Sequence, residues 1–118
     1  MEKFLFVLTR GLEDPVRVTR ALQLAKIAKE KGHDVHVFFT DDAVMLAQEG
    51  LIDNVMSPSG DEAVAQFTYL VVHNTPFYVC KPCAEFRKIK NEDLVENANF
   101  ATGHQLIDLA AESKVFTF

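Results

Sequence analysis

The stretch Lys3-Phe4-Leu5-Phe6-Val7-Leu8 decides the fold class of this chain. Its apolar residues follow one another without the polar alternation of a strand that faces water on one side. A continuous run of this kind is typical of a central parallel strand, because helices cover both of its faces. The run therefore predicts a protein of the α/β class.

Strand and helix patterns alternate along the rest of the chain, which predicts right-handed crossovers in a mostly parallel sheet. Asp14 is placed as the N-cap of the first helix, with Pro15 at its first position and Gly32 after its end. The predicted strands cover residues 3–8, 35–39, 76–79 and 115–118, with a further one near 97–100. The predicted helices cover residues 15–31, residues 43–49 after a Thr40-Asp41-Asp42 cap, and residues 101–112. A further helix is capped by Asp61 and ends at residues 74–75, and a turn or short helix covers residues 91–94.

Length and composition are those of an ordinary globular protein. The chain has 118 residues, of which 48% are hydrophobic and 25% are charged. A chain of this size buries a sizeable core without needing a disulfide or a metal ion. We therefore expect residues 1–118 to form a single domain.

The charge balance and the apolar runs exclude some classes of function. The net charge is −5, which argues against nucleic-acid binding, because such proteins neutralise phosphates with Lys and Arg. No apolar run approaches the ~20 residues that span a bilayer, and the first run is too short for the centre of a signal peptide. We expect a cytoplasmic protein, in which thiols stay reduced.

The stretch Phe77-Tyr78-Val79-Cys80-Lys81-Pro82-Cys83 holds both cysteines of the chain. Cys80 follows a predicted strand, at the sheet edge where α/β proteins bind ligands. Pro82 suits the first turn of a helix, whose N-terminus would favour the thiolate. A basic segment adds to this effect, with Lys81, Arg87, Lys88 and Lys90 beside one acid, Glu85. The pattern predicts a reactive nucleophile at Cys80.

Other interpretations of the cysteine pair stay open at this point. Both residues could be small buried hydrophobic side chains. His73 and His104 could complete a zinc site, although the spacing matches no standard zinc finger. The thioredoxin mechanism does not transfer, because Thr75-Pro76 precedes the pair instead of following it much later. We expect neither a metal ion nor an organic cofactor.

Polar residues that end the first two strands are candidates for ligand binding. Thr9, Gly11 and Asp14 follow the first strand, where helix N–H groups could bind an anion. An ordinary turn with a capped helix explains the same residues. Asp41 could face the same pocket, and Lys81 beside Cys80 completes the candidate set. No glycine-rich phosphate fingerprint is present.

The chain as a whole resembles the DsrE/DsrF-like family of small sulfur-handling proteins. The stretches that carry the resemblance are residues 3–8, Gly11-Leu12-Glu13-Asp14-Pro15, residues 20–25 and 35–39, Val79-Cys80 at a strand end, and residues 113–118. The resemblance implies a three-layer, flavodoxin-like α/β fold with a mostly parallel sheet of four to five strands. It also implies a cytoplasmic homo-oligomer, often a trimer or hexamer.

The resemblance assigns a role to Cys80 as well. It implies that this residue accepts sulfur as a persulfide from a donor protein and passes it to an acceptor. Cys83 departs from a single-cysteine relay and is a candidate for resolving the Cys80 persulfide as a disulfide. The leading hypothesis is thus a sulfur-relay or thiol-redox protein, either a sulfurtransferase or a thiol oxidoreductase. The alternative is a non-catalytic small-ligand-binding or scaffold subunit of an oligomer. In either case, exposed apolar residues such as those of the segment 67–72 would supply a subunit contact.

Overall fold

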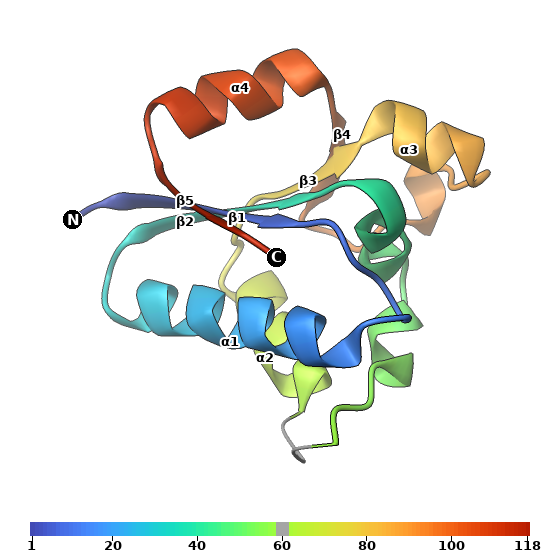
Figure 1. The fold of residues 1–118 in the computed structure, drawn as a ribbon, viewed down its shortest axis with the longest axis horizontal. Coiled ribbons are helices and arrows are strands. Elements are labelled where there is room, and N and C mark those ends of the chain that lie inside the picture. The colour runs from blue at the N-terminus through green and yellow to red at the C-terminus, as the bar shows by residue number, and fades with distance from the viewer. Residues whose placement is uncertain (59–61) are drawn as a thin grey trace.

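The computed structural model describes residues 1–58 and 62–118 and has three layers (Figure 1). Five strands form a sheet in the order β4-β3-β2-β1-β5, and every neighbouring pair is parallel. Helices α1 and α2 lie on one face of the sheet and α4 on the other (Figure 1). The predicted three-layer, flavodoxin-like fold is confirmed. The strands are β1 Lys3–Leu8, β2 Asp34–Phe39, β3 Phe77–Cys80, β4 Ala98–Ala101 and β5 Lys114–Thr117, and the α-helices are α1 Pro15–Glu30, α2 Ala63–Val72, α3 Lys81–Phe86 and α4 Gly103–Ala111.

Strand β1 lies inside the sheet, between β2 and β5. Phe6 and Leu8 pack into the larger core under α1 and α2, whereas Leu5 and Val7 pack into a smaller core under α4. This alternation needs apolar residues at every position, because both faces of the strand are buried. The continuous run at the N-terminus is thereby explained.

Helix α1 begins and ends where the sequence predicts. The Asp14 carboxylate accepts a hydrogen bond from the Arg17 backbone N–H at 3.3 Å, and Pro15 is the first helical residue. Gly32 follows the C-cap with a φ of +88°, a left-handed conformation that favours glycine. Ile27 of α1 stays 42% exposed and lies outside the buried stripe of the helix.

The second predicted helix is wrong in type and in boundaries. The chain forms a 3₁₀ helix, η1, at Asp41–Ala47, and Gln48 then adopts an extended conformation. Thr40 occupies the N-cap position, but its side chain makes no capping hydrogen bond. Asp41 has a φ of +51°, which is unusual for a residue other than glycine. A second 3₁₀ helix, η2, follows at Leu51–Asn54, and a third, η3, covers Asn91–Asp93, where a turn or short helix is predicted.

Helix α4 begins two residues later than predicted, because β4, the further strand predicted near 97–100, ends at Ala101. Thr102 and Gln105 form its capping box. Leu106 and Leu109 pack on the sheet, whereas Ile107 is 68% exposed and does not belong to the core. The predicted Asp61 cap of α2 lies outside the described residues.

The expectation of an exposed apolar segment at 67–72 is wrong. Phe67 and Leu70 lie on the buried side of α2, and Val72 is the large apolar residue of this segment that faces water. The subunit contact expected of this segment stays a prediction. No helix within the described residues has the length and the apolar character that crossing a bilayer demands.

Candidate functional site

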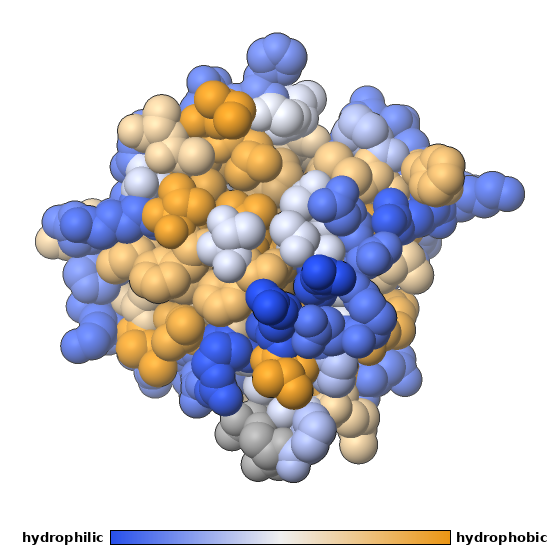
Figure 2. Space-filling model, in the orientation of Figure 1, coloured by the Kyte–Doolittle hydropathy of each residue, from blue (hydrophilic) through white to orange (hydrophobic). Residues whose placement is uncertain are grey.

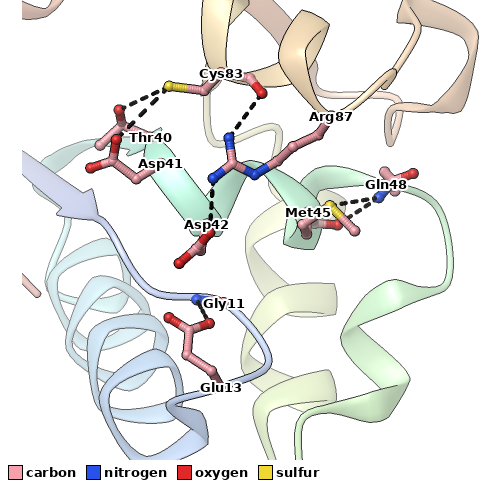
Figure 3. Close-up of polar contacts among 9 residues, drawn as sticks. All are labelled: Gly11, Glu13, Thr40, Asp41, Asp42, Met45, Gln48, Cys83 and Arg87. Atoms are coloured by element: carbon pink, nitrogen blue, oxygen red, sulfur yellow. Dashed lines mark hydrogen bonds and ion pairs between the residues drawn. The ribbon is translucent and has the colours of Figure 1, made fainter.

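The carboxyl ends of β2 and β3 lie side by side at one edge of the sheet. The two strands pair in parallel with Phe39 level with Val79, so the next residues, Thr40 and Cys80, emerge at the same height. Figure 3 shows Thr40 and Asp41 directed toward Cys83 of α3. The edge that the sequence predicts for ligand binding thus gathers both cysteines and the residues after β2.

Cys80 ends β3 and is also the N-cap residue of α3, and Cys83 lies in the first turn of that helix. Pro82 stands in this turn, as predicted. Both cysteines are free and half-buried. The Cys80 thiol donates a hydrogen bond to the sulfur of Cys83, and the Cys83 backbone N–H donates one to the sulfur of Cys80. The protonation state of each thiol therefore depends on that of the other.

The loop after β2 supplies further partners for Cys83. The Thr40 hydroxyl lies 3.7 Å from the Cys83 sulfur, and a carboxylate oxygen of Asp41 lies 4.0 Å from it (Figure 3). The backbone N–H of Asp41 also points to this sulfur. The left-handed backbone of Asp41 is of the strained kind that gathers at functional sites.

The two thiols have opposite shifts in pKa. Burial raises the pKa of Cys80, and the hydrogen bond that its thiol donates to Cys83 raises it further. Burial also acts to raise the pKa of Cys83, but hydrogen bonds from Cys80, Asp41 and Thr40 outweigh burial and lower it. Because adjacent thiols titrate as a pair, the pair loses its first proton easily and its second with difficulty. The negative charge of the singly ionised pair lies on Cys83.

The expectation that the basic segment lowers the pKa of Cys80 is wrong. The Arg87 guanidinium instead donates to an Asp42 carboxylate oxygen at 2.8 Å and to the Cys83 carbonyl oxygen at 3.1 Å (Figure 3). Arg87 thus holds α3 against the loop after β2. Lys81, Lys88 and Lys90 are exposed, where water screens their charge.

The structure separates the predicted ligand-binding residues into two groups. Asp41 contacts Cys83, and Lys81 is adjacent to Cys80 in the chain but faces water. Thr9 donates its hydroxyl and its backbone N–H to the Phe118 carbonyl oxygen, each at 2.8 Å. Gly11 is buried against the backbone of Asp42. The contacts of Thr9 and Gly11 are those of an ordinary turn, and a role of these two residues in ligand binding stays a prediction.

The histidines do not approach the thiols as ligands or bases in any contact of the described residues. His36 contacts the Tyr78 hydroxyl at 2.8 Å and Asp34 at 3.0 Å. His73 contacts the Tyr69 carbonyl oxygen at 2.8 Å, and His104 is exposed on α4. Within residues 1–58 and 62–118, no three His, Cys, Asp or Glu side chains gather in an arrangement that fits a metal ion. The zinc hypothesis gains no support.

Two contributors to the site are missed by sequence reasoning, namely Thr40 and Arg87. Thr40 is interpreted as a helix cap, and Arg87 as one member of a basic run. A usable signal does exist for Thr40, since it and Cys80 are each the first residue after a predicted buried strand. In a parallel sheet such residues lie at the same edge.

We predict that Thr40→Val slows alkylation of the thiol pair at neutral pH. The hydroxyl donates to the thiolate and so lowers the pKa of both cysteines, and valine keeps the side-chain shape without the donor. The rate below the first pKa should fall by up to about tenfold, the size of one hydrogen bond to a charged group. At high pH the rates should converge. The rate of alkylation by iodoacetamide, measured over a range of pH, tests this prediction. The control is Thr68→Val, at an exposed position on α2. If neither variant changed the pH profile of the alkylation rate, the role of Thr40 would be contradicted.

Comparison with known proteins finds a matching family model and similar sequences. The model of the DsrE/DsrF-like family matches residues 2–118. The uncharacterized protein MJ0989 of Methanocaldococcus jannaschii is 30% identical over 98% of this chain and 99% of its own length. The uncharacterized protein MK0008 of Methanopyrus kandleri is 29% identical over 82% of this chain and 77% of its own length.

Solved structures share the fold. The YchN protein from E. coli covers 100% of both chains with a TM-score of 0.84 at 24% identity. The protein of unknown function MTH1491 from Methanobacterium thermoautotrophicum also covers 100% of both chains, with a TM-score of 0.70 at 13% identity. At these identities the likeness concerns the fold alone.

Proposed function

The chain belongs to the DsrE/DsrF-like family, and we propose that it transfers sulfur through the Cys80–Cys83 pair. The observation that carries the proposal is the pair of half-buried, hydrogen-bonded thiols at the carboxyl end of β3, with their opposite shifts in pKa. A family of sulfur-relay type supports persulfide chemistry at such a site.

In the loading step, Cys80 is the nucleophile and Cys83 is the base. The Cys83 thiolate takes the proton of the Cys80 thiol through their hydrogen bond while the Cys80 sulfur attacks the terminal sulfur of a donor persulfide. A Cys80–sulfur bond forms, the sulfur–sulfur bond of the donor breaks, and the donor leaves as a thiolate. Cys80 suits this role because a thiolate of raised pKa is intrinsically more nucleophilic.

Two reactions compete for the loaded Cys80. An acceptor thiolate can attack the outer sulfur, which forms an acceptor persulfide and returns Cys80 as a thiolate. Alternatively, the Cys83 thiolate can attack the inner sulfur, which forms a Cys80–Cys83 disulfide and releases hydrosulfide. The disulfide must then be reduced by an external dithiol. After loading, Cys83 carries the proton, and a protonated thiol is a poor nucleophile, so loading itself favours delivery over resolution.

The binding-subunit alternative is less well supported, because Thr9 and Gly11 make packing contacts. Incubation of the reduced protein with inorganic polysulfide tests the proposal. We expect mass spectrometry of the peptide with Cys80 to show one added sulfur atom, which a dithiol reductant removes. A fully reduced protein that takes up no sulfur on either cysteine would contradict sulfur transfer.

A further inference from the structure

Helix α3 and the residues after it present an aromatic ring and three lysines beside the thiol pair. Phe86, the last residue of the helix, is 85% exposed, although an aromatic side chain gains much from burial when it finds a partner. Lys81, Lys88 and Lys90 are also exposed, and no ion pair of residues 1–58 and 62–118 engages them. We call these four residues the α3 patch. Figure 2 shows hydrophobic surface bordered by hydrophilic surface at the end of the molecule where Figure 1 places α3.

The turn that ends α3 fixes the backbone of the patch. The backbone N–H groups of Arg87 and Ile89 both donate to the Ala84 carbonyl oxygen, at 3.1 and 2.9 Å. Lys88, between them, has a φ of +59°, the left-handed conformation that closes many helices. Ile89 is buried, while Lys88 and Lys90 on either side of it stay exposed. The two lysines are thus presented from a fixed backbone, which lowers the entropic cost of binding a partner.

The charge of the patch differs from that of the chain as a whole. The net charge of the chain is −5, whereas the patch has three ammonium groups and Glu85 is the one carboxylate of α3. Such a local excess of positive charge favours an acidic partner over a basic one. A nucleic acid is a poorer match, because Arg87 is bound to Asp42 and Phe86 is the one aromatic residue among 81–90, whereas single-stranded nucleic acids stack on several.

The patch adjoins the sulfur atoms that react. Lys81 follows Cys80 directly, and Phe86 lies three residues after Cys83, which is about one helical turn. A thiol that takes sulfur from Cys80 has to come within bonding distance of the persulfide. When that thiol belongs to a protein, the residues around it must contact the surface around Cys80. The α3 patch is part of that surface.

We propose that the α3 patch docks the sulfur acceptor, and that this acceptor is a protein whose cysteine lies among acidic and apolar residues. Its carboxylates pair with the three lysines, and an apolar side chain contacts the Phe86 ring. The docked acceptor thiolate attacks the outer sulfur of the Cys80 persulfide, the persulfide sulfur–sulfur bond breaks, and Cys80 leaves as a thiolate. The inference rests on the proposed sulfur transfer and names the chemistry of its partner.

Peptides that differ in charge alone test the docking without any persulfide. Each has one cysteine between two leucines, with glutamates, glutamines or lysines at both ends, and its sulfur is activated as a mixed disulfide with thiopyridine. A protein thiolate attacks the peptide sulfur and releases thiopyridone, whose absorbance gives the rate. Each rate is divided by the rate of the same peptide with 2-mercaptoethanol. The acidic peptide should react at least about tenfold faster than the basic one at low salt, and high salt should remove this preference.

A lysine variant and a matched control locate the preference. The variant should react equally with the three peptides, because it keeps the length of each side chain and removes its charge; it carries Lys81→Gln, Lys88→Gln and Lys90→Gln. The control loses as much charge near the end of α1, before β2 begins, and should keep the wild-type preference; it carries Lys26→Gln, Lys29→Gln and Lys31→Gln. The glutamine peptide corrects for any change in the reactivity of the thiols themselves.

The apolar contact is tested by removing the exposed ring. Phe86→Ala should slow the reaction with all three peptides by about fivefold or more, the effect of losing a residue that matters at an interface. The three peptides share their leucines, so their order of rates should stay the same. Ile107→Ala, which removes an exposed apolar side chain on α4, should react as the wild type does. Equal rates for Phe86→Ala and Ile107→Ala would overturn the contact with Phe86.

The same peptides, as free thiols, then serve as sulfur acceptors for protein loaded with inorganic polysulfide. Mass spectrometry should show an added sulfur atom on the acidic peptide first. A charge preference in disulfide exchange without sulfur uptake by the protein would support the docking and overturn sulfur transfer. Equal exchange rates for all peptides, as a patch covered by a second copy of the chain would give, overturn the docking. An RNA oligonucleotide that binds in place of any peptide preference would overturn it as well.

Discussion

A Cys80→Ser protein is expected to take up no sulfur from inorganic polysulfide, while Cys83→Ser still forms a persulfide on Cys80. The chain has two cysteines, so each variant leaves one defined thiol. Serine keeps the shape of the side chain but its hydroxyl is not ionised at neutral pH. Loading of Cys80→Ser should thus fall to the level of the double variant.

The Cys83→Ser protein separates the base role from the nucleophile role. Its loading should be slower by up to about a hundredfold, the lower end of what a general base contributes. Its persulfide should also persist, because no second thiol can attack the inner sulfur and release hydrosulfide. Timed mass spectrometry and a hydrosulfide assay measure both effects. If Cys83→Ser failed to load and Cys80→Ser loaded normally, the two roles would be reversed.

The main features of the fold follow from local patterns in the sequence. The unbroken apolar run at residues 3–8 reflects a strand buried on both faces, and Asp14-Pro15 and Gly32 mark the ends of α1 through local backbone chemistry. These patterns predict the structure correctly because they depend on interactions between residues that are close together in the sequence. The placement of Cys80 at the carboxyl edge of the sheet follows in the same way, from its position after a buried strand.

The failures occur where a distant contact overrides a local preference. Thr40 has the chemistry of a helix cap, but its hydroxyl lies against Cys83, 43 positions along the chain. Arg87 belongs to the basic segment that is predicted to act on the thiols, but its guanidinium binds Asp42 instead. Ile107 continues an apolar stripe that α4 does not bury, since this helix covers its face of the sheet alone. The pairing of Arg87 with Asp42 leaves no mark in the spacing of residues, whereas the position of Thr40 directly after a buried strand is a usable signal.

Gly11→Ala is expected to destabilise the protein by about 1–3 kcal/mol, the usual cost of forcing an extra atom into packed structure. A Cβ atom at residue 11 would lie 2.6 Å from the carbonyl oxygen of Asp42 and 3.2 Å from its carbonyl carbon. These are backbone atoms, which cannot rotate away as a flexible side chain would. The loop after β1 or the loop after β2 must therefore move. Urea unfolding measures the loss, which is a large share of the roughly 5–15 kcal/mol that stabilises a small domain.

Gly103→Ala is the matched control, because a Cβ atom there meets nothing within 4 Å and the residue starts α4. It should be neutral or slightly stabilising, since alanine restricts the unfolded chain more than glycine does. The same pair of variants also tests how Cys83 is positioned. Asp42 holds Arg87 and follows Thr40 and Asp41, so a displaced loop should also weaken the contacts to Cys83 and slow alkylation at neutral pH. If Gly11→Ala were as stable and as reactive as Gly103→Ala, the loop after β2 would not depend on this close approach, and the positioning of Cys83 would have to come from α3 alone.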